Sequence, residues 1–375
     1  MNQFKTVPNI LFGAGCSKQL ADVCKSSGIR KPFIVTDNGV LACGLLDRVM
    51  SSIPSATIYS EVIADPPAAT VEHAAQIASG DNCDAVIGFG GGSSMDVAKL
   101  VAVLMGGEQQ LAKMYGVGNV VGSRVPLIQV PTTAGTGSEA TAVAIVTTGE
   151  HTKSGVVSDQ LFADTIILDP ELTLGLPASV TAATGIDAMV HAIEAFTSKR
   201  LKNPISDMFA LRALALLSGS IHAAVSHGDD IMARSDMLLG AMLAGQAFAN
   251  APVGAVHALA YPLGGIYHIP HGLSNSLVLP YVLRFNATAA LDQYDTLAAV
   301  ILESTAVGEG AMRLSDYFLQ LAGELELPTT LRAVGIPEDG LSELAEQSQL
   351  QQRLLINNPR EVSLAESLTI YQQAY

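Results

Sequence analysis

The sequence has little charge and no long apolar run, and both shortages narrow the class of protein. Charged residues make up 15% of the 375 residues and apolar residues 49%, so the chain can build a large buried core. Gly, Pro, His or Asp interrupts every apolar stretch before it reaches the roughly 18 residues that suggest a membrane span. The first sixteen residues also lack the basic start and apolar segment of a signal peptide. We therefore expect a cytoplasmic protein without a membrane partner.

Basic charge is the scarcer of the two signs. The chain has 35 acidic and 20 basic residues, a formal net charge of −15, and its one close group of cations is Lys199, Arg200 and Lys202. Such a chain is a poor ligand for nucleic acid or for an anionic membrane. Low charge combined with high apolar content indicates an interface between copies, so we expect a homodimer or a higher homo-oligomer.

Cysteine is scarce as well, and its spacing excludes the usual cysteine-based sites. Four cysteines are scattered over the first hundred residues without a CxxC pair: Cys16, Cys24, Cys43 and Cys83. This arrangement argues against a disulfide framework and against a zinc cluster. It favours buried free thiols in a reducing compartment.

The pattern of apolar residues, which predicts strands and helices, changes near residue 178. Before it, β-branched runs alternate with helical patterns, with strands expected at 32–36, 56–60, 84–90, 127–133 and 165–170, helices at 39–50, 69–79 and 93–105, and a β-hairpin at 142–158. This alternation predicts a parallel, doubly wound, Rossmann-like sheet. After it, helices are expected at 179–199, 205–226, 231–249, 287–303, 313–325, 341–350 and 363–374, with prolines such as Pro280 near helix boundaries. We predict an α/β dinucleotide-binding domain at 1–178 and an all-α metal-binding and catalytic domain at 179–375.

Two loops at predicted strand ends have the composition of a phosphate site. The first, GFGGGSSMD at 88–96, joins a strand to a helix, where glycines and the helical N–H groups accommodate a diphosphate. Ser93 replaces the third glycine of GxGxxG, so this loop alone fits a tight turn equally well. The second, PTTAGTGSE at 131–139, follows another strand at the edge where open α/β sheets bind ligands. Together the two loops favour a phosphate site over turns without a ligand.

Two charged residues in this half have competing interpretations. Asp37 ends the first predicted strand, where a carboxylate accepts hydrogen bonds from a ribose and repels a 2′-phosphate, which favours NAD over NADP. An aspartate that caps the next helix explains the residue equally well. Lys153 either faces a phosphate or is a solvated lysine.

The second half contains a candidate metal site. Asp187 and His191 are spaced i, i+4 on an apolar helical pattern, so both lie on one face. The segment 254–275, whose composition is not that of a surface helix, adds His257, His268 and His271. One carboxylate and two or three imidazoles in apolar surroundings suit a divalent transition metal. His268 fits a ligand, a proton relay or a surface residue.

These motifs, taken in order, resemble those of the iron-containing (group III) alcohol dehydrogenases, whose fold is dehydroquinate synthase-like. The segments are GGGSSMD, PTTAGTGSEAT, DPELT, TGIDAMVHAIE, NAPVGAVHALAYPLGG and IPHGLSN, and the resemblance extends over nearly the whole chain. It implies metal ligation by Asp187, His191, His257 and His271. It also implies that Gly91, Gly92, Ser93, Thr132 and Thr133 hold the cofactor diphosphate with Lys153 nearby, and that Asp37 is the NAD-selecting acid; Asp96 and Ser138 of the same loops complete the predicted cofactor site.

One departure from the family concerns the proton path. Many members carry a second histidine four residues after the first in this region, and here that place is Tyr261. Tyr261 and His268 are therefore the candidate residues for proton transfer.

The resulting expectation is a metal-dependent alcohol dehydrogenase or aldehyde reductase that uses NAD and Fe²⁺ or Zn²⁺. The metal would stabilise the alkoxide of a small or medium primary alcohol while hydride passes to the nicotinamide. Met189, Phe248 and Tyr267 would line an apolar substrate pocket. Alternatives are an NAD-using lyase or a polyol dehydrogenase of the same fold, similar to dehydroquinate synthase or glycerol dehydrogenase, and a non-catalytic NAD-binding protein.

Overall fold

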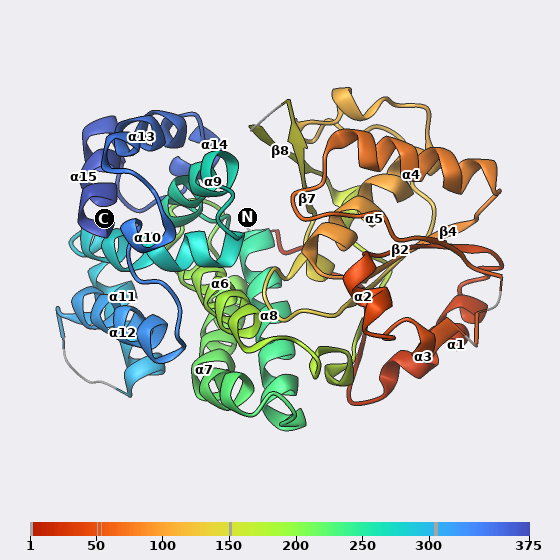
Figure 1. Ribbon diagram of the computed structural model, residues 1–375, viewed down its shortest axis with the longest axis horizontal. Helices are drawn as coiled ribbons and strands as arrows, with labels where there is room; N and C mark the ends of the chain where they lie inside the picture. The colour runs from red at the N-terminus through yellow and green to blue at the C-terminus, as the bar shows by residue number, and fades with distance from the viewer. Residues whose placement is uncertain (1–2, 51, 54, 150–151, 304–306) are drawn as a thin grey trace. The chain divides into compact units, whose positions relative to one another are not determined.

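The computed structural model describes residues 3–50, 52–53, 55–149, 152–303 and 307–375. The chain divides into two compact units (Figure 1): Thr6–Gly175, and Leu176–Tyr375 together with the start of the chain up to Lys5. We call them the sheet unit and the helical unit. The two units are defined by how compactly their residues pack, which says nothing about function. The functions predicted for residues 1–178 and 179–375 therefore stay predictions.

The sheet unit is built on a parallel six-stranded sheet. Its strand order is β1-β9-β6-β4-β2-β3, and every pairing within it is parallel. The strands are β1 (Asn9–Phe12), β2 (Pro32–Val35), β3 (Thr57–Tyr59), β4 (Ala85–Gly90), β6 (Leu127–Pro131) and β9 (Thr165–Leu168). The predicted doubly wound sheet is confirmed. Strand β1 was not predicted, because it is a short edge strand whose side chains are mostly exposed.

Helices connect these strands, and one prediction about them was wrong. The connections include α1 (Leu20–Ser26), α4 (Ala68–Gly80) and α5 (Gly92–Gly106). The helix expected at 39–50 is two short pieces, α2 (Asn38–Ala42) and α3 (Asp47–Met50). Gly44 lies between them with φ +65°, a left-handed conformation that ends a helix. The predicted hairpin is confirmed as the antiparallel pair β7 (Val143–Thr148) and β8 (Thr152–Val157). The short β5 (Gly116–Val117) adds a third strand to this sheet by pairing in parallel with β8.

The helical unit packs long helices around α6 (Ala178–Thr197), which is buried over most of its length. Helices α7 (Pro204–Ser226) and α8 (Ile231–Asn250) lie beside α6 and against each other (Figure 1). The unit continues with α9 (Ala255–Tyr267), α10 (His271–Asn286), α11 (Leu291–Leu302), α12 (Gly310–Glu324), α13 (Leu341–Gln349), α14 (Gln352–Leu355) and α15 (Leu364–Ala374).

Helices α9 and α10 were missing from the prediction. Both are largely buried, so they lack the charged outer face that makes a helix visible in a sequence. Both also contain a proline, Pro262 in α9 and Pro280 in α10. The placement of Pro280 at a helix boundary was therefore wrong.

By length and composition α7 would suffice to cross a membrane, and so would α8 and α9 taken together despite a bend of 107° between them. Helix α7 contacts α6, α8 and α11 within the helical unit. A core helix of a folded unit is expected to be this apolar.

All four cysteines are free thiols. Cys16 and Cys24 are buried as predicted, Cys83 is half-buried, and Cys43 is exposed, so its predicted burial was wrong.

Candidate active site

Four potential metal ligands converge inside the helical unit. Asp187 and His191 come from α6, His257 from α9, and His271 begins α10. One ligand atom from each lies within 4.8 Å of all the others. The Asp187 Oδ1 atom is 3.7 Å from Nε2 of His271 and 4.0 Å from Nε2 of His257. Ligands about 2.1 Å from a tetrahedral ion are about 3.4 Å apart, so the cluster has nearly the dimensions of a metal site.

Electrostatics favour an ionised Asp187 and a neutral His257, the forms of these two residues that bind a metal. Burial alone would raise the pKa of the Asp187 carboxyl, but the three neighbouring imidazoles and the amide of Asn275 outweigh burial and lower it. Burial and the adjacent His191 and His271 hold the pKa of His257 well below its usual value. A carboxylate beside a neutral imidazole is the form that a metal requires.

Asn275 supplies an independent sign that a cation fits among these groups. Its amide nitrogen lies 2.5 Å from Asp187 Oδ1 and 3.3 Å from Nε2 of both His257 and His271. Three ligand atoms thus converge on one donor. Among the described residues, the amide oxygen of Asn275 is buried without a hydrogen-bond partner. The donor group of Asn275 thus occupies the point on which three ligand atoms converge, and such a point also attracts a cation.

Glu194 is a neighbour of the cluster that the sequence analysis missed. It lies on α6, is 6% exposed, and accepts the backbone N–H of Val256 at 2.7 Å. Its other oxygen is 2.6 Å from Nδ1 of His257. Burial raises the pKa of Glu194 to about 7. The signal was available, because Glu194 is spaced i+3 from His191 and shares its helix face.

The two candidate proton-transfer residues lie in different settings. The ring of Tyr261 is 6.0 Å from that of His271. His268 is exposed and ends α9 with φ +57°. Of the residues predicted to line a substrate pocket, Phe248 stacks on His191 with ring centroids 4.5 Å apart, whereas Met189 is fully buried.

In the sheet unit, the two predicted phosphate loops lie next to each other. Gly91 is the N-cap of α5, and the loops follow the paired strands β4 and β6. A Cβ added to Gly91 would lie 3.5 Å from Thr133, and one added to Gly92 would lie 2.7 Å from Thr136. A side chain at Gly92 would therefore displace the second loop. The backbone of Thr132 is also fixed, because its N–H donates to Gly90.

Asp37 caps a helix, as one of its two interpretations predicted. Its carboxylate accepts the backbone N–H of Val40 at 3.0 Å and the hydroxyl of Ser94 at 3.2 Å. The second bond ties Asp37 to the first turn of α5. Lys153 is not a solvated lysine, because its side chain is 8% exposed and pairs with Asp65 at 2.7 Å.

Asp96 and Ser138 belong to a buried network centred on Lys99, which the sequence analysis also missed. The Lys99 ammonium, fully buried, donates to Ser138, Thr141 and the carbonyl of Val143 at 2.7, 3.1 and 2.6 Å. Asp96 accepts the Ser138 hydroxyl at 2.6 Å. Burial lowers the pKa of Lys99, and Asp96 opposes that effect. The network joins the first loop to the second.

Comparison with known proteins decides the family. Residues 8–170 match the family "Iron-containing alcohol dehydrogenase", and residues 181–375 match "Fe-containing alcohol dehydrogenase family, C-terminal". The chain belongs to the iron-containing alcohol dehydrogenases. The predicted family is confirmed, and with it the class of reaction: this iron-type dehydrogenase is an enzyme that interconverts alcohols and aldehydes.

Relatives within the family agree over the full length of the chain. Long-chain-alcohol dehydrogenase 1 of Geobacillus thermodenitrificans is 39% identical, covering 97% of this chain and 94% of that protein. The crystal structure of a 1,3-propanediol oxidoreductase matches with a TM-score of 0.96 and 31% identity, covering 100% of both chains. Sulfoacetaldehyde reductase from Bifidobacterium kashiwanohense, solved in complex with NAD⁺, matches with a TM-score of 0.91 and 29% identity, covering 100% of this chain and 98% of that one. These matches confirm the predicted fold.

Proposed function

We propose that this enzyme is an NAD-dependent, iron-containing alcohol dehydrogenase and aldehyde reductase, with Asp187, His191, His257 and His271 as its metal ligands. The observation that carries the proposal is the convergence of a buried carboxylate and three imidazoles within 4.8 Å. A metal bound there supplies a Lewis acid for the alcohol oxygen. Imidazole and carboxylate ligands suit Fe²⁺ and Zn²⁺ alike, and the family favours iron.

The proposed NAD site is formed by the two loops of the sheet unit. Glycines at 91 and 92 and the hydroxyl of Ser93 begin α5, where free N–H groups and the helix dipole favour a diphosphate. In the second loop, Thr133 lies beside Gly91 and the backbone N–H of Thr132 donates to Gly90, which supports a role for both threonines in this site. Asp96 accepts the Ser138 hydroxyl and the backbone N–H of Ile145 and so connects α5 to the second loop and to β7, while Lys153 pairs with Asp65.

Support for NAD as the dinucleotide comes from two sides. The related sulfoacetaldehyde reductase holds NAD⁺. In this chain the Asp37 carboxylate is tied to Ser94 at the start of α5, close to the proposed diphosphate site. A carboxylate at such a place accepts bonds from a ribose hydroxyl and repels a 2′-phosphate, which makes NADP the poorer ligand.

For proton transfer we propose Tyr261 ahead of His268. The Tyr261 ring lies beside His271, whereas His268 ends α9 and is exposed. A phenol within reach of the bound alcohol can accept the proton that the alcohol loses while its own proton passes to water.

Small or medium primary alcohols and their aldehydes are the proposed substrates. Phe248, stacked on His191, gives the metal site an apolar neighbour that suits an alkyl chain. We also propose a cytoplasmic homodimer or higher homo-oligomer. The free thiols support the compartment, and the exposed Ile10 and Phe12 on the edge strand β1 support an interface between copies.

The proposal is tested by following NADH absorbance with a panel of aldehydes. The enzyme is assayed as isolated, after removal of metal by a chelator, and after return of Fe²⁺ or Zn²⁺. We expect aldehyde-dependent oxidation of NADH that disappears with the metal and returns with Fe²⁺. If no carbonyl compound oxidises NADH under any of these conditions, a lyase or a non-catalytic NAD-binding protein is favoured instead.

A further inference from the structure

We propose that Glu194 is a positioning residue that fixes the tautomer and orientation of His257 and thereby sets the affinity of the metal site. This inference rests on the proposed function, because it concerns how the helical unit prepares its ligand set. Three observations carry it: the two contacts of the Glu194 carboxylate, the small cavity beside it, and the absence of Glu194 from the set of residues that can share one metal.

The first observation is that both oxygens of Glu194 meet nitrogen atoms of consecutive residues. One oxygen accepts the peptide N–H of Val256 at 2.7 Å, and the other is 2.6 Å from Nδ1 of His257. When a metal occupies Nε2 of a neutral imidazole, the remaining ring proton is on Nδ1. Glu194 accepts the hydrogen bond from that N–H and leaves the Nε2 lone pair available to a metal on the side of the ring where Asp187 lies 4.0 Å away.

This contact also joins α6 to the first turn of α9. Val256 and His257 lie in the first turn of α9, whose N–H groups have no partner within the helix. A carboxylate from α6 therefore stabilises the start of α9 and orients the ligand that this turn carries. Two other ligands, Asp187 and His191, belong to the same α6, so one rigid helix provides two ligands and orients a third.

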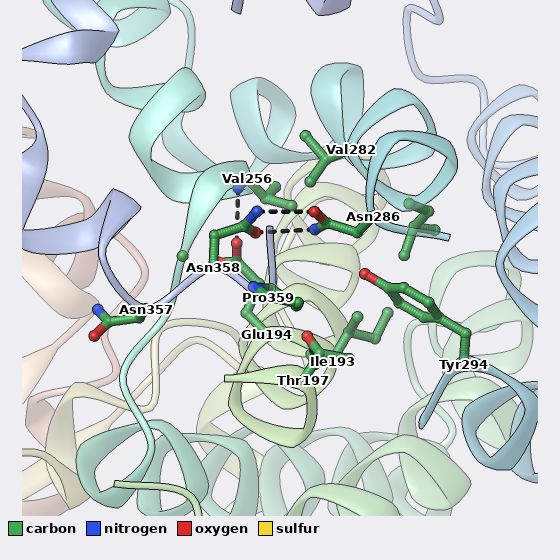
Figure 2. A pocket seen from close by; sticks show the side chains of 12 residues that line it. Ile193, Glu194, Thr197, Val256, Val282, Asn286, Tyr294, Asn357, Asn358 and Pro359 are labelled. Atoms are coloured by element: carbon green, nitrogen blue, oxygen red, sulfur yellow. Dashed lines mark hydrogen bonds between the residues drawn. The ribbon is translucent and has the colours of Figure 1, made fainter. Parts of the chain in front are cut away.

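The second observation is that the cavity beside Glu194 has no room for a substrate. It measures about 10 Å³, which is near the minimum for one water. Figure 2 shows Glu194 bound to the backbone of Val256, next to the paired amides of Asn286 and Asn358 and the phenol of Tyr294. Its surroundings on this side are filled by protein side chains.

The third observation is that Glu194 stands outside the ligand cluster. The group of residues able to share one metal contains Asp187 and the three histidines and does not include Glu194. Its contact with that group runs through His257. A carboxylate that orients a ligating histidine in this way changes metal affinity by about 10- to 100-fold in other sites.

Glu194→Gln tests the role with almost no change of volume. The glutamine amide has one oxygen for two N–H donors, so its NH₂ group must face either Val256 N–H or the Nδ1 proton of His257. We expect Co²⁺ affinity, measured by competition with a chelator, to fall by about 10- to 100-fold. The visible spectrum of the Co²⁺ protein should also change, because it reports coordination geometry.

Thr197→Val is the matched control. Thr197 lies on the same helix and lines the same cavity, but its hydroxyl donates to Ile193 and contributes nothing to the contact with His257. We expect this variant to bind Co²⁺ as the wild type does, even if its metal-free form is less stable. Equal affinity of Glu194→Gln and wild type, or an equal loss in both variants, would overturn the inference.

A measurement on the wild-type protein remains decisive if Glu194→Gln does not fold. Histidine labelled with ¹⁵N, in protein loaded with diamagnetic Zn²⁺, reveals which ring nitrogen carries the proton. We expect a proton on Nδ1 of His257, whose ring signals are assigned through correlations with the backbone amide of the same residue in the Zn²⁺-loaded wild type. A proton on Nε2 would contradict the inference. Wild-type protein that binds neither metal contradicts the proposed function itself, which keeps the two failures apart.

Discussion

The two candidate sites are built in opposite ways. In the sheet unit, the dinucleotide loops depend on side chains that are absent: Gly92 leaves no room for a Cβ beside Thr136. In the helical unit, the metal cluster depends on four side chains that must be present, contributed by three helices. The loop site in the sheet unit therefore depends on the backbone conformation of short contiguous motifs. The metal cluster depends on the packing of helices that are far apart in the sequence. Substitutions that shorten a side chain should therefore weaken metal binding most. Substitutions that add a side chain to a glycine should weaken ligand binding at either site.

His257→Ala should have the largest effect. The substitution removes one of four ligands and leaves Glu194 without its imidazole partner. We expect loss of bound metal and of NADH oxidation, while NAD binding, which we propose for the sheet unit, stays near the wild-type value. Metal analysis, the absorbance assay and NAD titration measure the three quantities separately.

An exposed histidine in the same unit provides the control. His222 on α7 lies 3.4 Å from Glu324 and is 53% exposed. His222→Ala should retain metal and activity. Full activity of His257→Ala after dialysis against a chelator would show that the ligand assignment is wrong.

Adding a single methyl group to a glycine should separate the two sites. A Cβ at Gly272 would lie 2.4 Å from the carbonyl oxygen of Ala183, which would push α10 and His271 away from Asp187. At Gly92 it would lie 2.7 Å from Thr136 and displace the second loop. Each change should lower the free energy of unfolding by about 1–3 kcal/mol. We expect Gly272→Ala to lose metal, and Gly92→Ala to keep metal but show a raised KM for NAD.

Two helical glycines without neighbours serve as controls. Nothing lies within 4 Å of a Cβ added at Gly323 in the helical unit or at Gly80 in the sheet unit. Alanine at either position should leave metal content and the KM for NAD unchanged. Loss of metal in Gly92→Ala, at normal NAD affinity, would contradict the separation of the sites.

Lys99→Met should weaken the sheet unit without touching the metal. The change removes the buried ammonium from Ser138, Thr141 and Val143 and leaves Asp96 without its cation. Breaking one side of a buried ion pair costs about 3 kcal/mol. We expect lower stability in urea and weaker NAD binding, with normal Co²⁺ affinity. Wild-type NAD affinity in this variant would show that the network does not position the loops.

The smallest predicted effect concerns pH. Burial alone would raise the pKa of the Asp164 carboxyl, but hydrogen bonds from Arg124 and Leu127 outweigh burial and lower it. A carboxyl with a lowered folded-state pKa contributes stability above its unfolded pKa of about 3.9, and this contribution is lost as pH falls through the folded value. Because Asp164 is half exposed, we expect Asp164→Asn to cost about 1 kcal/mol or less at pH 7. The deficit should shrink in unfolding experiments near pH 3; a constant difference at both pH values would contradict this origin.

What the sequence could predict follows the same contrast. The two loops that we propose for the dinucleotide are contiguous motifs at strand ends, so their positions could be predicted, and the i, i+4 pair on α6 could be predicted for the same reason. Lys99 was missed because its partners Ser138, Thr141 and Val143 lie about 40 residues away and are brought to it by folding, whereas the i+3 spacing of Glu194 from His191 was visible in the sequence and was overlooked. Helices α9 and α10 were missed because each has a proline in its interior and almost no charged residues, and β1 because an exposed edge strand of four residues has almost no pattern.

A crystal of the enzyme grown with NAD, measured with anomalous scattering at the iron and zinc edges, tests the central claim most directly. We predict a single strong peak bonded to Asp187, His191, His257 and His271, with the iron edge giving the signal in protein isolated with its native metal. Absence of metal from this cluster in active protein, or a metal bound by other residues, would contradict the account.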